Sequence, residues 1–304
     1  MDTKVLFVGN YKGGVGKTTS VLNFAKYFTI EGKRILVLDL DPQSSLSEIL
    51  ISNNHDYNGQ LSDLDETKTL NYVFDLHISR IKRYNSLNLH VGEDIVQTYR
   101  KGKFDFIASS LFYKNGMGLD ELAVRMEDNV EYLSILKQFL EAILKVETYD
   151  YVLIDCPPSN NLITRSAFLA SDFYIIPTIL DSISTNGVAH YIQTVQKTYK
   201  RYCVESEDCT LMKHYFGAPP RLVGIFCTFM RGQVDYRQSL RRLKDNVCHR
   251  CKCEEDEIFI FEEEINNYID IARSTEIGDV SKARKDYEAL SKRVLDRIMA
   301  MDCG

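Results

Sequence analysis

The sequence predicts an α/β fold, a doubly wound and mainly parallel sheet flanked by helices. Short apolar runs recur along the chain, and the stretches between them carry apolar residues at helical spacing. Such alternation is typical of parallel strands that helices bury on both faces. At 304 residues the chain is near the largest size that packs around one core, so we expect a single domain over residues 1–304.

The segment up to Asp39 is expected to form a strand–helix–strand unit. Lys4–Gly9 is a short apolar run, typical of a strand buried on both faces. Apolar residues then recur at helical spacing from Thr18 to Phe28, and Gly32 gives a stop signal before the second apolar run, Arg34–Asp39. Two strands connected in this way pair in parallel with a right-handed crossover.

Later parts of the chain continue the pattern, with some interruptions. Further strands are predicted at Phe104–Ala108, Tyr151–Asp155, Phe173–Pro177 and Leu222–Thr228. We expect insertions where the alternation is lost, near residues 51–71, 203–220 and 248–257.

The composition bears on location and partners. No stretch reaches the roughly 18 apolar residues of a membrane span, and the N-terminus runs directly into a strand, unlike a signal peptide. We therefore expect a cytoplasmic protein whose eight cysteines are reduced or bind metal. The net charge of −6 argues mildly against nucleic acid as the default partner, although local patches matter more than totals.

A glycine-rich segment, Lys12–Thr19, joins the first strand to the first helix. Its glycines allow a tight turn with inward-pointing N–H groups, and the helix dipole adds to the same point. This predicts a phosphate site in which Lys17 reaches the β- and γ-phosphates and Thr18 ligates Mg²⁺. Tyr11 stands where the usual P-loop pattern has glycine, and Lys12 is an extra cation. The predicted nucleotide-binding residues are Gly13, Gly14, Val15, Gly16, Lys17, Thr18 and Thr19.

Acidic residues end two of the predicted strands, at the sheet edge where ligands bind in open α/β folds. Asp41 is the candidate for orienting an attacking water, whereas Asp39 is expected to support the loop or the metal shell. Asp155 ends an apolar strand in the manner of a Walker B motif and is expected to hold Mg²⁺. The predicted metal-site residues are thus Thr18, Asp39 and Asp155.

These three segments resemble those of the ParA/MinD (Soj-like) family, P-loop NTPases with a deviant Walker A motif. The loop Lys12–Thr19 is similar to the family's loop, Asp39–Gln43 to its switch I and Asp155–Ser159 to its switch II. The resemblance implies an ATPase that binds ATP or ADP with Mg²⁺ and forms a homodimer when ATP is bound. It also implies that Lys12 reaches the partner's phosphates, as an arginine finger does, and that Lys12, Lys17 and Asp41 act in hydrolysis.

The resemblance further implies a role in plasmid or chromosome partition, or in positioning of another cargo, with an adaptor protein that stimulates hydrolysis. The chain departs from the family pattern after Ile265, where Asn266 and Asn267 replace proline and arginine, and at Asp270, where partition members carry a DNA-contacting arginine. These departures put the adenine contacts and DNA binding in question.

Residues 231–252 carry seven Lys or Arg against two acids, a local excess of positive charge. On a helix this strip would bind DNA non-specifically, which would place the protein at the nucleoid. The alternative is a solvated helix face paired with the acidic runs at 254–257 and 262–264. The DNA-binding candidates are Arg231, Arg237, Arg241 and Lys244.

Other partners and ligands remain open at this point. A MinD-like membrane tail needs a basic amphipathic C-terminal helix, which a helix packed on the sheet would also resemble. A metal carrier or iron–sulfur protein would place cysteines beside the switch segments, where only Cys156 stands. Cys248 and Cys251 are candidate zinc ligands, with Cys203 and Cys209 as a second pair, and free thiols on a loop are the alternative.

Overall fold

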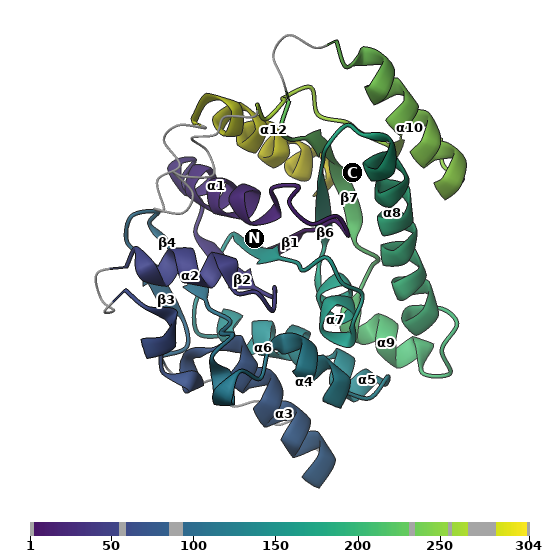
Figure 1. Ribbon diagram of the computed structural model, residues 1–304. Coiled ribbons are helices and arrows are strands. Elements are labelled where there is room, and N and C mark those ends of the chain that lie inside the picture. The colour runs from purple at the N-terminus through teal and green to yellow at the C-terminus, as the bar shows by residue number, and fades with distance from the viewer. Residues whose placement is uncertain are drawn as a thin grey trace.

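A computed structural model of the chain describes residues 3–54, 59–84, 94–230, 235–254, 257–266 and 284–302. Its described strands form one seven-stranded sheet in the order β3-β4-β2-β5-β1-β6-β7 (Figure 1). Every neighbouring pair is parallel except β3 with β4. The strands are β1 Lys4–Val8, β2 Ile35–Asp39, β3 Gln97–Tyr99, β4 Phe104–Ile107, β5 Tyr151–Asp155, β6 Phe173–Thr178 and β7 Arg221–Cys227.

The predicted fold class is therefore confirmed, and all six predicted strands are present within a residue or two of their expected ends. Edge strand β3 was not predicted. It has three residues, one of them exposed, and pairs antiparallel with β4, so it carries no long apolar run. A strand this short gives little periodic signal.

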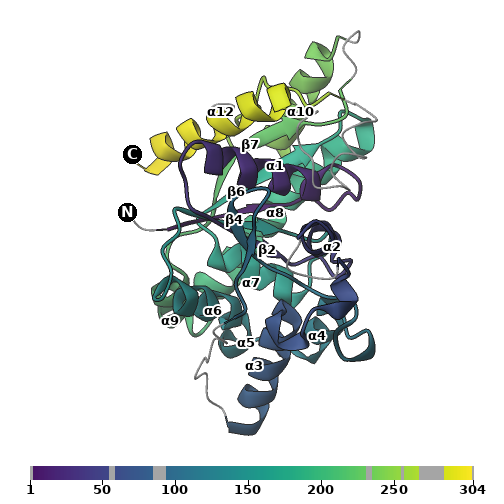
Figure 2. The same cartoon turned by 90° about the vertical axis from the view of Figure 1, so that its left-hand side faces the viewer.

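Helices cover both faces of the sheet, as Figure 2 shows from the side. One face is covered by α1 Lys17–Ile30, α2 Ser45–Ser52 and α12 Arg284–Asp302, which share one apolar cluster with β1 and β2. Helices on the other face are α3 Leu70–Tyr84, α4 Leu119–Arg125, α5 Val130–Leu133, α6 Ile135–Leu144, α7 Leu162–Ala170, α8 Ser182–Cys203 and α10 Arg237–Cys251. Short helices α9 Cys209–Phe216, η1 Leu61–Asp63, η2 Glu66–Lys68 and η3 Tyr113–Asn115 complete the described elements.

The three segments expected to be insertions contain regular structure. Residues 51–71 include the end of α2, both η1 and η2, and the start of α3, while residues 55–58 lie outside the described part of the chain. Residues 203–220 contain α9, which packs beside the C-terminal end of α8, and 248–257 begin inside α10. That these segments are insertions stays a prediction.

The apolar stripe of the C-terminal helix is used within the fold. Leu290, Val294 and Ile298 of α12 are buried in the cluster that also contains Phe24 and Phe28 of α1. This stripe is thus a core face, which removes the sequence basis for a membrane-binding tail. Across the described residues, no helix combines the length and the apolar character that crossing a membrane requires.

The sheet brings the predicted site residues to one edge. Asp39 at the end of β2 lies directly opposite Asp155 at the end of β5, and Asp155 also lies opposite Val8 of β1. The glycine-rich loop follows β1 at this same carboxyl edge. Parallel pairing therefore places the loop between the two acidic strand ends and the strands β6 and β7.

Candidate nucleotide and magnesium site

The glycine-rich loop adopts the backbone that its sequence allows. Gly14 and Gly16 have φ values of +71° and +82°, a left-handed conformation that other residues adopt only with strain. Helix α1 begins at Lys17, directly after Gly16. The first N–H groups of α1 lack partners within the helix, so the loop and the helix end together form an anion-binding hollow.

Lys17 lies inside this loop rather than in solvent. The residue is 7% exposed, and its Nζ donates a hydrogen bond to the Lys12 carbonyl oxygen at 3.2 Å. Burial lowers the pKa of Lys17, while the Asp155 and Asp41 carboxylates act in the opposite direction. A buried cation with one weak carbonyl partner is well placed to bind phosphate oxygens.

Thr18 and Asp155 are in direct contact. The Thr18 hydroxyl donates to Asp155 Oδ2 at 2.7 Å, whereas Asp155 Oδ1 is buried and accepts no hydrogen bond from the described residues. Burial, reinforced by the Asp39 carboxylate, raises the pKa of Asp155 well above its ordinary value. A hydroxyl beside a buried carboxylate with an unused oxygen fits a hard divalent cation such as Mg²⁺.

Asp39 supports the loop that follows it. Its Oδ2 accepts hydrogen bonds from the Ser47 N–H at 2.8 Å and from the Ser47 hydroxyl at 2.7 Å, and its Oδ1 accepts from the Asp41 N–H at 3.1 Å. Burial raises the pKa of Asp39 to about 6. Since both oxygens already accept protein hydrogen bonds, the geometry favours loop support over direct contact with a metal ion.

A cavity of about 610 Å³ opens above these residues, with Asp41 and Pro42 along one side. It contains most of the residues predicted to bind nucleotide, whereas Asp39 and Asp155 lie buried beneath it. Val15 is also buried, and its carbonyl oxygen accepts a hydrogen bond from Thr228. The predicted residues that line the cavity are Gly13, Gly14, Gly16, Lys17, Thr18, Thr19 and Asp41.

Comparisons with known proteins agree with this geometry. A family model described as an AAA domain matches residues 3–207. Two relatives are the sporulation initiation inhibitor protein Soj of Bacillus subtilis, 27% identical over 197 residues, and the chromosome-partitioning ATPase Soj of Treponema pallidum, 29% identical over 194 residues. The chain belongs to the AAA domain family, and its predicted resemblance to the ParA/Soj proteins is confirmed by these relatives.

The matches differ in how much of each protein they cover. They span 65% of this chain and 66% of the Bacillus protein, and 64% of both chains for the Treponema protein. A third relative, an uncharacterized protein of Mycobacterium tuberculosis, is 31% identical over 198 residues, 65% of this chain. The chain spans about half of that relative, 54% of its length.

Solved structures share the fold. A putative plasmid partition protein of Borrelia burgdorferi bound to AMPPNP aligns with a TM-score of 0.67 at 18% identity, over 99% of this chain and 100% of that one. An ATP complex of a variant of McdA from Cyanothece also aligns with a TM-score of 0.67 at 18% identity, over 99% and 96% of the two chains. At this identity the likeness concerns the fold alone.

The lysine characteristic of the ParA/Soj resemblance lies outside the cavity in this structure. Lys12 is not one of the described residues that line the cavity. Its Nζ forms an ion pair with Asp181 instead. Asp181 stands between β6 and α8 and was not singled out from the sequence. Its place four residues after a predicted strand, at the carboxyl edge of the sheet, was the available signal.

Tyr11, which replaces the usual glycine in this ParA/Soj chain, points away from the phosphate hollow. Its ring contacts Tyr191 of α8 edge-on, with ring centroids 4.9 Å apart, and lies 5.4 Å from His190. The preceding Asn10 donates to the Pro177 carbonyl oxygen at 2.9 Å and accepts from the Lys12 N–H at 3.0 Å. A large side chain is therefore accommodated because it packs on α8 instead of entering the loop.

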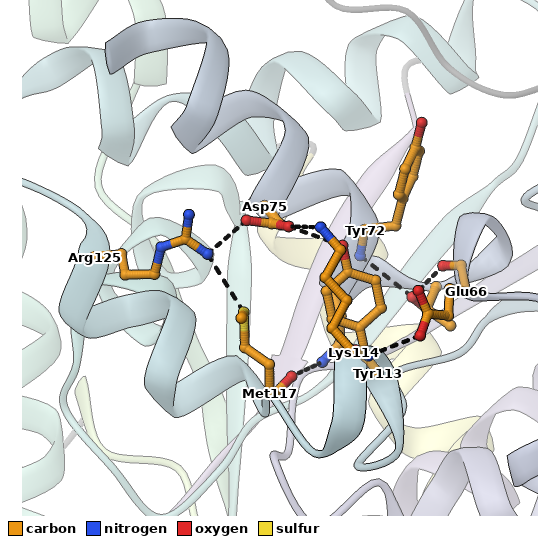
Figure 3. A network of polar contacts seen from close by, with 9 residues as sticks. Glu66, Tyr72, Asp75, Tyr113, Lys114, Met117 and Arg125 are labelled. Carbon is orange, nitrogen blue, oxygen red and sulfur yellow. Dashed lines mark hydrogen bonds and ion pairs between the residues drawn. The ribbon is translucent and has the colours of Figure 1, made fainter. Parts of the chain in front are cut away.

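The lining of the cavity also contains Asp120, a carboxylate that the sequence analysis missed. Figure 3 shows how the segment before it is held: the buried Asp75 of α3 accepts hydrogen bonds from Tyr113, Lys114 and Arg125 at 3.0, 2.5 and 2.6 Å. Burial alone would raise the pKa of Asp75, but these three groups together outweigh burial and lower the pKa. This network fixes the entry into α4, where Asp120 lies.

The basic strip lies on α10, as predicted. Leu243 and Val247 face the core beside α8, while Arg237 and Arg241 are exposed and Lys244 is half-buried. Arg237 lies 3.8 Å from Asp235, and in the described ranges neither acidic run forms an ion pair with Arg241 or Lys244. Arg231, Asn267 and Asp270 fall outside the described residues.

The four-cysteine zinc site does not form. Cys251 Sγ donates to the Ala189 carbonyl oxygen near the start of α8, whereas Cys203 is buried at the other end of that helix. The fourteen-residue separation corresponds to about 21 Å along a helix. Within the described part of the chain, no group of three or more His, Cys, Asp or Glu side chains is arranged to hold a metal ion. Cys248 and Cys251 are free thiols.

Proposed function

We propose that this chain is a nucleotide-switch ATPase that binds ATP with Mg²⁺, dimerises in that state and hydrolyses ATP to ADP and phosphate. The observation that carries the proposal is the contact between Thr18 and Asp155 beside Lys17, with one buried Asp155 oxygen unused. Thr18 and Asp155 are the residues suited to hold Mg²⁺. The ion would neutralise charge on the β- and γ-phosphates.

The chain's own groups supply the remaining steps. Loop amides and Lys17 bind and orient the phosphates, and this positioning lowers the activation free energy of hydrolysis. Asp41 lines the cavity and, in this proposal, orients the attacking water and accepts its proton. Lys12, outside its own cavity, leaves Asp181 and reaches the phosphates of the partner in the dimer, where it stabilises charge in the transition state.

The cellular role proposed is DNA partition or positioning of another cargo. Two observations support this role: one of the relatives is a chromosome-partitioning ATPase, and α10 carries exposed basic residues. Non-specific DNA and an adaptor that stimulates hydrolysis are the proposed partners, and the proposed location is cytoplasmic, at the nucleoid.

ADP with magnesium and an ATP analogue with magnesium occur in cobyrinic acid a,c-diamide synthase of Mycobacterium smegmatis, a structural neighbour.

The alternative classes lack a supporting observation in the described residues. The amphipathic face of α12 is buried in the core, so it offers no membrane surface. Cys156, beside the second switch segment, is fully buried, and burial raises the pKa of its thiol well above the ordinary value. A protonated, buried thiol is a poor ligand for a metal cluster.

The test is a paired measurement of turnover and mass. Phosphate release is followed with Mg-ATP and with ATP in excess EDTA, and molar mass is measured by light scattering with ATP, ADP or no nucleotide. We expect magnesium-dependent release, and a dimer with ATP that reverts to monomer with ADP. Absence of ATP binding by calorimetry would refute the proposal, and binding without any change of mass would refute its dimer step.

A further inference from the structure

One aromatic side chain in the nucleotide cavity is not accounted for by the motifs. Phe229 lines the cavity and is 41% exposed. Its φ is +57°, in the left-handed region, where a bulky side chain is a genuine outlier. The exposed apolar ring and the strained backbone at Phe229 both cost stability. Backbone strain of this kind is retained mainly at functional sites.

The strained position is fixed from both sides. The Thr228 hydroxyl donates to the Val15 carbonyl oxygen of the phosphate loop at 3.0 Å, and the Thr228 N–H donates to the Thr178 carbonyl oxygen at 2.8 Å. The Met230 N–H donates to the Ile265 carbonyl oxygen at 3.0 Å. Residue 229 is thus held between two anchored neighbours, one of them bonded directly to the loop that would hold the phosphates.

Phe229 does not serve the core. In the described part of the chain it belongs to none of the apolar clusters, and a Cβ placed on Gly16 would lie 3.9 Å from its ring. The ring therefore lies beside the phosphate loop with much of its surface facing the cavity. Packing alone does not explain it.

The order of the strands gives a direction to the bound nucleotide. Asp41 follows β2 and Asp155 ends β5, on one side of the loop that follows β1, while Phe229 follows β7 on the other side. The acidic side suits the metal ion and the terminal phosphate. The nucleoside must then extend toward β7, which lies two strand spacings, about 9.5 Å, from β1.

We propose that Phe229 is the platform on which the nucleobase stacks. This inference rests on the proposed ATP-binding function and adds the residue that distinguishes a nucleotide from a bare polyphosphate. A planar base on an aromatic face is a favourable arrangement for any base, so Phe229 supplies affinity and orientation rather than strict selection among bases.

The test compares two ligands by calorimetry, Mg-ATP and magnesium tripolyphosphate, on the full chain and its variants. Phe229→Ala is expected to weaken ATP binding about tenfold or more, while tripolyphosphate binding stays unchanged. Phe229→Tyr and Phe229→Trp restore ATP affinity, and Phe229→Leu, which keeps apolar volume without a ring face, does not. Phe112→Ala is the matched control, because Phe112 is 49% exposed but lies outside the described lining of the cavity.

Each outcome has a defined meaning. A Phe229→Ala variant that binds ATP like the wild type, or loses ATP and tripolyphosphate in parallel, overturns the stacking role while leaving the phosphate site standing. A wild-type chain that binds tripolyphosphate as tightly as ATP also overturns it. A wild-type chain that binds neither ligand overturns the proposed function itself. Phe229→Gly, which removes the backbone strain, should raise thermal stability and still lose ATP affinity.

Discussion

The Lys12 ammonium is ion-paired with Asp181 of its own chain instead of lying among the residues that line the nucleotide cavity. Side chains of both residues are about one third exposed or more, at 33% and 42%, so the pair contributes modestly to stability. It nevertheless has to break before Lys12 can reach another chain. The pair would therefore compete with the proposed dimerisation.

Asp181→Asn should accordingly favour the ATP-bound dimer. An exposed pair of this kind is worth up to about fivefold, and a symmetric dimer breaks two of them, so the dimer dissociation constant should fall by up to about 25-fold. Sedimentation equilibrium with ATP and magnesium measures it. Asp181 and Asp245 both line a second, smaller cavity beside α8 and α10. Asp245→Asn is the control, because Asp245 does not pair with Lys12. A weaker or unchanged dimer for Asp181→Asn would contradict the competition.

Lys17→Ala should abolish ATP binding, a loss of more than about 100-fold, because it removes the buried cation of the phosphate loop. Calorimetry with Mg-ATP measures the loss, and thermal unfolding checks that the variant is folded. Lys145→Ala, at a position far from the cavity lining, should bind normally. Tight ATP binding by the Lys17 variant would count against the phosphate site.

Asp41→Ala should bind ATP and dimerise but release phosphate about 100-fold more slowly or worse, since the group that orients water is gone. Single-turnover phosphate release separates this step from binding. Asp120→Ala removes a different carboxylate from the same cavity and should retain turnover. Equal loss in the two variants would mean that cavity charge, rather than Asp41 itself, controls hydrolysis.

The double variant Arg237→Glu, Arg241→Glu should weaken DNA binding at low salt by on the order of 1 kcal/mol or more, because phosphate contacts dominate non-specific affinity. The paired control, Lys82→Glu with Arg83→Glu, makes the same charge change at the exposed end of α3. Fluorescence anisotropy with a DNA duplex, in ATP and in ADP, is the measurement. Equal effects of the two double variants would remove α10 as the DNA-binding surface.

His77 gives a pH dependence of stability that is independent of nucleotide. Burial, with a smaller effect of Arg80, lowers its pKa from 6.5 to about 4. The unfolded chain binds a proton at His77 below pH 6.5 and the folded chain does not, so the free energy of unfolding falls as the pH decreases from 6.5 to 4. The shift corresponds to roughly 3 kcal/mol at the acid end.

His77→Gln should flatten this acid limb in urea unfolding series, whereas His249→Gln, at an exposed position, should not. An unchanged slope in the His77 variant would show that other groups, the buried carboxylates among them, dominate the acid range.

The backbone of the proposed phosphate site was predictable from sequence because its determinants are local. Consecutive glycines, Lys17 and Thr18 specify both the turn and the helix start, and the structure has a glycine turn followed by a helix from Lys17. Asp155 was equally predictable from the sequence because it ends an apolar run. Parallel pairing then brings these segments together without any further sequence signal.

Residues that reach the site through long-range packing were missed. Asp120 depends on a network centred on Asp75, which is 45 residues earlier in the chain, and a single sequence does not show such pairing. Phe229 follows a predicted strand, but its left-handed backbone is held by hydrogen bonds of its two neighbours, from Thr228 to Val15 of the phosphate loop and from Met230 to Ile265. The four-cysteine zinc arrangement is not supported by the described residues, because cysteine spacing does not report that α8 separates the two pairs.

Tyr11 gives the phosphate loop a mechanical connection that glycine would not provide. Its ring is wedged against α8, whose 22 residues make a rod about 33 Å long. The same helix packs against α9 at its C-terminal end and against α10 along its first turns. The phosphate loop is thus packed directly against the middle of α8, so the position of the loop depends on the position of this helix.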